Sequence, residues 1–121
     1  MNDLPPAPGW PIHPALVTNA FEIPGFRITR SFGVVRGLVV RAPGFGAGFA
    51  ASLEALGGGN VATYIQLCEK ARADAFFALL QHAAQVGGNA IIGMRYDATE
   101  LGGQSALTEV LAYGTAVWCE R

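Results

Sequence analysis

Apolar and polar residues repeat with two different periods in the second half of the chain. From Asn60 to Val86 apolar residues recur every three or four positions, which predicts a helix of roughly 27 residues. Gly87 and Gly88 follow, and apolar and polar residues then alternate from Asn89 to Asp97 and from Leu107 to Trp118. This alternation predicts two strands joined by a long hairpin loop, placed in one layer against the helix.

The first half adds a third strand and a shorter helix. Alternating and β-branched residues from Phe26 to Arg41 predict a strand, in which Gly33 and Gly37 can permit a bend or the close approach of another backbone. Phe45 to Leu56 has apolar residues at helical spacing and predicts a short helix. The predicted fold class is α+β, with one long and one short helix packed on a three-stranded antiparallel sheet.

Five prolines within the first 14 residues predict an N-terminal arm without regular structure. We therefore divide the chain into an arm, residues 1–20, and an α+β domain, residues 21–121. Trp10 and Ile12 leave two alternatives open, because they can anchor the arm to a neighbouring surface or belong to a loosely held terminus.

The composition predicts self-association. The chain has 121 residues, enough for one domain, of which 51% are hydrophobic and 14% charged. The charged fraction of a typical domain is about 25%. Because so few charged residues are available to cover a monomer of this size, burial between identical subunits is expected.

The charge pattern and the apolar runs argue against two classes of partner. The net charge is −1 and the arginines are scattered, so the chain lacks the basic patch that nucleic-acid binding requires. No apolar run approaches the roughly 20 residues of a membrane span, and the first 20 residues lack the pattern of a signal peptide. We expect a cytoplasmic protein that binds neither nucleic acid nor membrane.

Two segments carry a family resemblance: YIQLCEKARADAFFALLQHAAQVGGNAIIGMRYD, Tyr64 to Asp97, and TEVLAYGTAV, Thr108 to Val117. With FGVVRG, Phe32 to Gly37, they resemble the YbjQ family, which is often labelled a heavy-metal-binding domain. Members of that family are similar to dodecin-like subunits that assemble into closed rings, usually pentamers. The resemblance implies a homo-oligomeric ring for this chain. The chain differs from the family pattern in having GGN where GAN is common, and Leu107 where methionine often stands.

The sequence identifies no cofactor, and a metal ion has one plausible route. Cys68 and His82 are 14 positions apart on the predicted helix, about 21 Å at 1.5 Å per residue, so they cannot bind the same ion within one subunit. Cys119 or Glu109, repeated around the axis of a ring, can supply several ligands. Cys119 and Cys68 are therefore the metal candidates. The alternative is that both are free thiols, with Cys68 a small buried residue.

Charged residues on the predicted helix and strands are the candidates for a ligand site or an interface. Arg72 interrupts the apolar stripe of the helix and needs a carboxylate or several carbonyl groups. The candidate carboxylates are Glu69 and, from the same sheet or from a neighbouring subunit, Asp97 and Glu109. Arg72 then either fixes the helix on the sheet or presents its charge to an anionic ligand between subunits. Arg95 and Glu109 have the same strand parity, so a register that pairs them is allowed.

No motif in the sequence indicates catalysis. Asp97 and Glu100 flank the hairpin loop but lack a nearby nucleophile, and the glycine-rich stretch from Gly44 to Gly48 does not match a nucleotide-binding motif. We predict a non-enzymatic homo-oligomer that binds a metal or small ligand at subunit interfaces. The alternatives are a scaffold that recruits a protein through the N-terminal arm, and a small hydrolase or isomerase that uses Asp97, Glu100 or Glu109 with Arg72.

Overall fold

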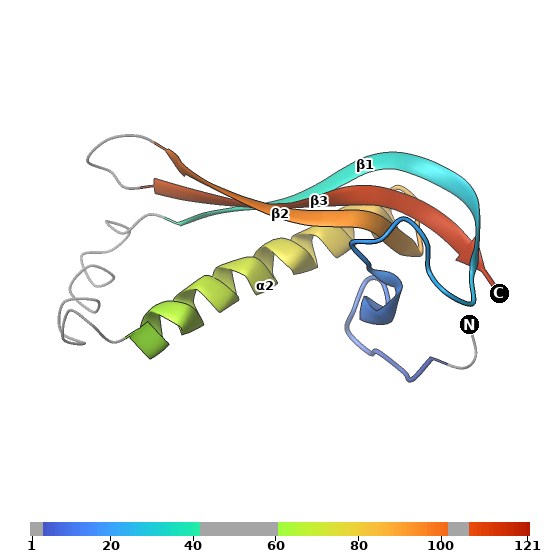
Figure 1. The fold of residues 1–121 in the computed structure, drawn as a ribbon, viewed down its shortest axis with the longest axis horizontal. Coiled ribbons are helices and arrows are strands. Elements are labelled where there is room, and N and C mark those ends of the chain that lie inside the picture. Colours follow the sequence, from blue (N-terminus) through green and yellow to red (C-terminus); the bar gives the residue numbers. More distant parts are fainter. Residues whose placement is uncertain (1–3, 42–60, 102–106) are drawn as a thin grey trace.

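A long helix lies beneath one face of a three-stranded antiparallel sheet (Figure 1). The computed structural model describes residues 4–41, 61–101 and 107–121. Its elements are η1 (Pro14–Leu16), β1 (Arg27–Arg41), α2 (Val61–Gln85), β2 (Ala90–Leu101) and β3 (Leu107–Glu120), with β3 in the centre of the sheet. The two-layer α+β prediction is confirmed. The predicted short helix from Phe45 to Leu56 lies outside the described residues.

Strand β1 bends and contacts the helix at the two glycines that the sequence singled out. The pairing with β3 shifts between Ile28 and Arg30 and again between Ser31 and Gly33, and Gly33 has a φ of 90°. At Gly37 a Cβ atom would overlap the carbonyl oxygen of Ala75 and the amide nitrogen of Leu79. Glycine therefore allows the backbone of α2 to cross directly against β1.

Helix α2 ends in a Schellman motif. The Gly88 amide donates to the carbonyl of Ala83 at 2.9 Å and the Gly87 amide to that of Ala84 at 3.1 Å. Gly87 has a φ of 100°, in the left-handed region that glycine tolerates. The two glycines thus stop the helix and turn the chain into β2.

The buried face of α2 agrees with the predicted apolar stripe at Ala75, Leu79 and Ala83 and differs from it toward the start of the helix. The residues buried against the sheet form a row of small and aliphatic side chains: Ala71, Ala75, Leu79 and Ala83. Ile65 is 54% exposed, and Cys68 and Arg72 are exposed as well. The helix is rotated toward its alanine side because Gly37 and the alanines allow closer backbone contact than the larger side chains would. Arg72 and Cys68 are therefore not buried, contrary to the prediction.

The hairpin strands are longer than predicted, and β2 contains a bulge. Strand β2 continues past Asp97 to Leu101, which pairs with Leu107. Ile92 pairs with Thr115 and Arg95 with Tyr113, so Gly93 and Met94 together oppose Gly114. This bulge sets which residues of β2 and β3 lie opposite each other beyond it.

The N-terminal segment packs on the domain. Ile12 is 4% exposed within the main core, and the Trp10 ring lies 6.1 Å from that of Phe76 and 5.8 Å from that of Phe77. Val17 forms a parallel bridge with Ile91 at the edge of β2. Of the two alternatives, the structure favours an anchored segment. Recruitment of a partner through this segment remains a prediction.

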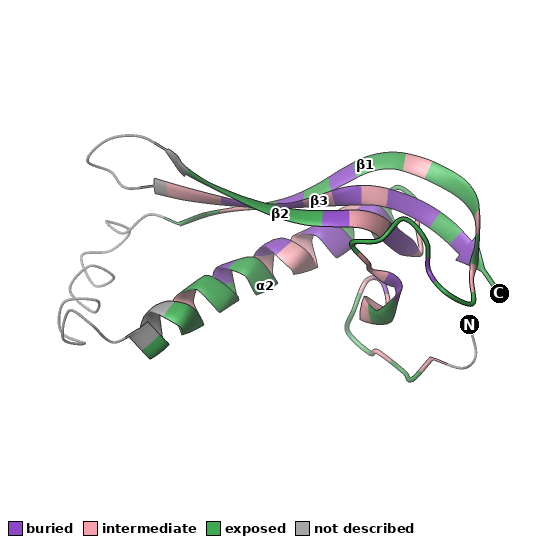
Figure 2. Ribbon diagram, in the orientation of Figure 1, coloured by how far each residue is buried: buried purple, intermediate pink, exposed green. Residues whose placement is uncertain are grey.

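Two hydrophobic clusters occupy opposite faces of the sheet. The larger cluster lies between α2 and the sheet and includes Ala112 and Ala116 of β3. The smaller includes Val117 and Cys119, which alternate with Ala116 along β3, and it is covered by Leu16 and Ile23. Buried residues therefore concentrate in the half of the sheet near the C-terminal end of α2 (Figure 2).

Candidate functional site

The outer face of the sheet, opposite α2, is uncovered over half of its length. Three of its apolar side chains come from β1: Val34 is 75% exposed, Leu38 51% and Val40 50%. We call this surface the open face. It comprises the outward residues of the three strands at this end: Val34, Arg36, Leu38, Val40, Arg95, Asp97, Thr99, Glu109, Leu111 and Tyr113.

Two arginines flank a tyrosine across the open face. Tyr113 of β3 pairs with Arg36 of β1 on one side and with Arg95 of β2 on the other. Directly opposed residues share a sheet face and have Cβ atoms about 5 Å apart. Neither arginine forms an ion pair within the described part of the chain. The row therefore consists of two guanidinium groups on either side of a phenol, and the described residues form no ion pair with either guanidinium.

The next two rows of the open face carry the carboxylates. Leu38, Leu111 and Asp97 form one row, and Val40, Glu109 and Thr99 form the other. Successive rows are about 6.8 Å apart, two residues along a strand. The structure thus brings three predicted site residues, Arg95, Asp97 and Glu109, to one surface. The predicted pairing of Arg95 with Glu109 is wrong, because the β2 bulge places Arg95 opposite Tyr113 and Thr99 opposite Glu109.

The backbone of the arginine row is fixed to α2. The Arg36 amide donates to Nδ1 of His82 at 3.1 Å, and the Arg36 carbonyl oxygen lies 3.3 Å from the same nitrogen. The adjoining residue, Gly37, lies against the backbone of α2. His82 therefore has a structural role, and Arg36 lies where contacts with His82 and at Gly37 hold β1 against α2.

Arg72 lies on the helix side of the sheet, away from the other candidates. Its guanidinium carbon is 5.3 Å from the centroid of the Tyr96 ring, within the range of a cation–π contact. Burial raises the pKa of Tyr96, the charge of Arg72 lowers it, and the charge of Glu69 raises it further. The described residues provide no carboxylate ion pair to Arg72, contrary to the prediction. An exposed guanidinium keeps its hydration and needs none.

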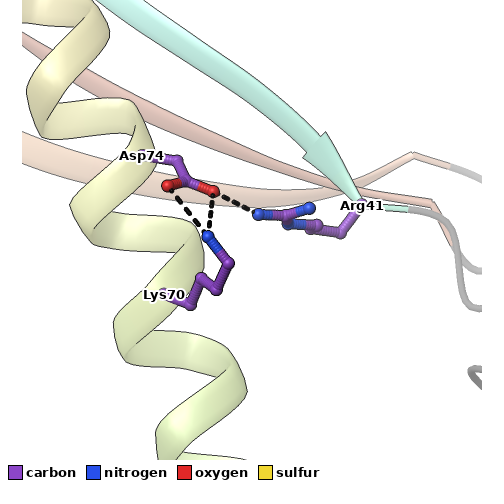
Figure 3. Close-up of polar contacts among 3 residues, drawn as sticks. All are labelled: Arg41, Lys70 and Asp74. Carbon is purple, nitrogen blue, oxygen red and sulfur yellow. Dashed lines mark hydrogen bonds and ion pairs between the residues drawn. The ribbon is translucent and has the colours of Figure 1, made fainter.

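An ion-pair cluster joins the end of β1 to α2. Arg41 Nη2 lies 2.5 Å from Oδ2 of Asp74, and Lys70 Nζ lies 3.4 Å from Oδ1 of the same carboxylate (Figure 3). All three side chains are at least 40% exposed. Surface pairs of this kind contribute little to stability, so the cluster orients the strand end rather than forming a site.

The described part of the chain does not fit a metal ion within one subunit. No group of three or more histidine, cysteine, aspartate or glutamate side chains converges there. Cys68 is exposed on α2, whereas Cys119 is buried, and both are free. Burial raises the pKa of the Cys119 thiol and so disfavours the thiolate that binds metals. His13 is engaged by the Pro5 carbonyl oxygen and the Ala15 amide.

Sequence reasoning missed two of the three residues in the arginine row, Arg36 and Tyr113. The available signal was the parity of positions along each strand. Arg36 has the same parity as the outward apolar residues of β1, and Tyr113 has the opposite parity to the small inward residues of β3. Parity assigns a face but not a cross-strand partner, and the partner depends on the bulges in β1 and β2.

The fold and the open face define a small two-layer α+β protein whose exposed sheet surface carries a basic row. The family model described as "Putative heavy-metal-binding" matches residues 15–120. The chain therefore belongs to this family, YbjQ_1, and the resemblance is confirmed.

Relatives and a solved structure agree with this assignment. UPF0145 proteins of Burkholderia thailandensis and Burkholderia mallei are each 55% identical over 108 residues, which cover 89% of this chain and 96% of theirs. A crystal structure of a protein of unknown function of the DUF74 family, from Pediococcus pentosaceus, matches 86% of this chain and 96% of its own. Its TM-score is 0.51 at 19% identity, which supports the fold alone. In the part of the chain that the structure describes, no helix is long and apolar enough to cross a membrane.

Proposed function

We propose that the protein is a non-enzymatic homo-oligomer that binds a small oxyanion on the open face of its sheet. The observation that carries the proposal is the row of Arg36, Tyr113 and Arg95. A carboxylate or phosphoryl group above Tyr113 can accept hydrogen bonds from both guanidinium groups and from the phenol.

The geometry of the row suits a single anionic group. Arg36 and Arg95 are separated by two strand spacings, about 9.6 Å between backbones, so their long side chains can meet above β3. Two like charges placed around one tyrosine favour a bound anion over an empty site. The carboxylates of Asp97 and Glu109, in the following rows, repel a second anionic group. We therefore expect a ligand with one oxyanion and an uncharged or cationic remainder that extends over Leu111.

The second part of the proposal is the assembly of the subunits into a ring. A ring of subunits, with the pentamer that the family resemblance implies, would turn the open faces toward a shared space and shield their apolar side chains from water. The low charged fraction and the exposed Val34, Leu38 and Val40 support association. We place the assembly in the cytoplasm, where two free cysteines remain reduced.

Isothermal titration of the purified protein with inorganic phosphate and, separately, with acetate tests the oxyanion site. We expect one site per subunit, and Arg36→Gln and Arg95→Gln should each weaken binding by about tenfold or more, since each removes a charged donor. Arg27→Gln is the matched control, because Arg27 pairs with Glu120 outside the open face and should leave affinity unchanged. Binding of neither anion, or equal losses in all three variants, would refute the site.

Elemental analysis of the untagged protein separates the anion from a metal. We expect less than one equivalent of any transition metal per subunit, because the described donor residues do not converge. A stoichiometric metal that is lost on Glu109→Gln or Cys119→Ala would replace the oxyanion proposal with a site formed between subunits.

A further inference from the structure

A strongly exposed phenylalanine and an open aromatic groove lie at opposite edges of the sheet. Phe21 is 71% exposed beside β2. The groove, of about 520 Å³, lies at the β1 edge and is lined by Thr29, Arg30, Phe32, Val86, Gly87 and Trp118. We propose that Phe21 and Glu22 of one subunit enter this groove of the next, so that subunits join head to tail. This inference rests on the proposed homo-oligomer and names the contact that builds it.

Phe21 is held as a rigid projection. The residues before it are bonded to the edge of β2: the Gly93 amide donates to the carbonyl of Ala20 at 2.8 Å and the Met94 amide to that of Thr18 at 3.0 Å. The ring lies against Gly93, where a Cβ atom would be 2.9 Å from its Cε1 atom. Ile23, two residues later, is buried. The projection is therefore ordered before any contact, which lowers the entropy cost of binding.

The groove has both polar and apolar walls and is only partly covered. Trp118 is 39% exposed and Val86 38%, and the Arg30 guanidinium lies 4.7 Å from the centroid of the Phe32 ring. An entering phenylalanine can make edge or offset contacts with both aromatic rings. The volume lies within the usual range for ligand pockets, about 300 to 1,000 Å³.

Charge complementarity supports a second copy as the occupant. Glu22 follows the projecting Phe21 and forms no ion pair within the described residues, and Arg30 in the groove forms none either. The carboxylate of Glu120, beside the groove, already accepts from the Trp118 indole at 3.2 Å and pairs with Arg27. The phenylalanine and the carboxylate of one subunit thus match the aromatic walls and the Arg30 guanidinium of the next.

The positions of the two features determine the type of assembly. Strands β1 and β2 are the two outer strands of the sheet, so the groove and the projection belong to different edges of each subunit. A contact between different surfaces of identical subunits is heterologous, and it closes into a ring when the rotation between neighbours permits. Each subunit then supplies one projection and one groove.

Native mass spectrometry of the wild type and of two single variants tests the contact. We expect the wild type to be a multiple of 12.7 kDa, and Phe21→Asp and Val86→Asp each to be single subunits with unchanged circular dichroism, because both side chains are exposed. Ile65→Asp is the matched control on the exposed end of α2 and should keep the wild-type mass. Mixing the two disrupted variants should give a species of two subunits, because one intact projection meets one intact groove.

Reversing the charges of Glu22 and Arg30 is the second test of the contact. Glu22→Arg and Arg30→Glu should each raise the subunit dissociation constant by about tenfold, and the double variant should restore most of the affinity. A wild type of single-subunit mass would overturn the proposed homo-oligomer itself. An oligomeric wild type whose Phe21→Asp and Val86→Asp variants remain assembled, or fail to associate on mixing, would overturn this contact alone.

Discussion

The two ends of the sheet are built differently. At the end near Ala116 and Val117, α2 covers one face and the N-terminal segment the other, so successive residues of β3 are buried on both sides. At the end near Leu38 and Arg95, α2 covers the inner face and the outer face is open (Figure 2). The covered end concentrates the burial that stabilises the fold, and the open end leaves charged and apolar groups exposed.

A matched pair of leucine truncations tests this difference most strongly. Leu79 is fully buried between α2 and the sheet, and Leu38 is 51% exposed on the open face. Leu79→Ala should lower the free energy of unfolding by about 2 to 5 kcal/mol, because it removes buried methyl groups and leaves a cavity. Leu38→Ala should cost less than about 1 kcal/mol. Denaturant unfolding at one fixed subunit concentration measures both, and losses of equal size would show that the open face is as important for folding as the core.

The two cysteines allow the difference between exposed and buried positions to be tested by their chemical reactivity. Cys68 is exposed on α2, and Cys119 is buried with a raised pKa because of that burial. A disulfide reagent such as DTNB at neutral pH should modify Cys68 at least about 100-fold faster, since thiolate and access are both needed. Cys68→Ala should abolish the fast phase, and Cys119→Ala only the slow one. Fast modification of both residues in the native protein would contradict the burial of Cys119.

The raised pKa of Cys119 also predicts a dependence of stability on pH. Because the folded state holds the thiol proton more tightly than the unfolded state, this contribution is fully present below the ordinary pKa of 9.0 and is lost as pH rises through the folded pKa. Unfolding free energies between pH 8 and pH 10.5 should therefore fall less steeply in Cys119→Ala than in the wild type. Identical slopes in the two proteins would exclude this linkage.

The smallest effect is expected at the ion-pair cluster of Figure 3. Arg41→Gln removes the pair with Asp74, but both side chains are at least 40% exposed, so solvent already screens their attraction. The loss should be below about 1 kcal/mol and should shrink further in 0.5 M salt. Thermal unfolding at two salt concentrations measures it. A larger loss that is insensitive to salt would mean that packing, rather than charge, holds this strand end.

Periodicity predicted the elements well because it depends on local spacing. The long helix was predicted from Asn60 to Val86, and it begins at Val61 and ends at Gln85. Strand β1 begins at Arg27, one residue after the predicted start. Gly33 and Gly37 were identified correctly, since a missing side chain is visible in the sequence. The face of α2 was predicted less well, because the alanine side and the larger apolar side have similar spacing, and contact with Gly37 decides between them.

The candidate site was only partly predictable, for a related reason. Parity correctly gave Arg95 and Glu109 the same sheet face. Their partners across the sheet depend on the bulge at Gly93 and Met94, which the sequence did not locate. Arg36 and Tyr113 were overlooked because neither residue is unusual in its own strand, and the basic row exists only when three strands are aligned.

The hydrogen bond between His82 and the main chain of Arg36 also bears on solubility. Strand β1 is an outer strand of 15 residues, rich in valine, and such a strand can template the addition of further chains into fibrils. An imidazole ring seated on its amide near the middle interrupts the continuous ladder that fibril growth requires. The protein can thus keep a long apolar strand at its margin with a built-in obstacle to amyloid-like stacking.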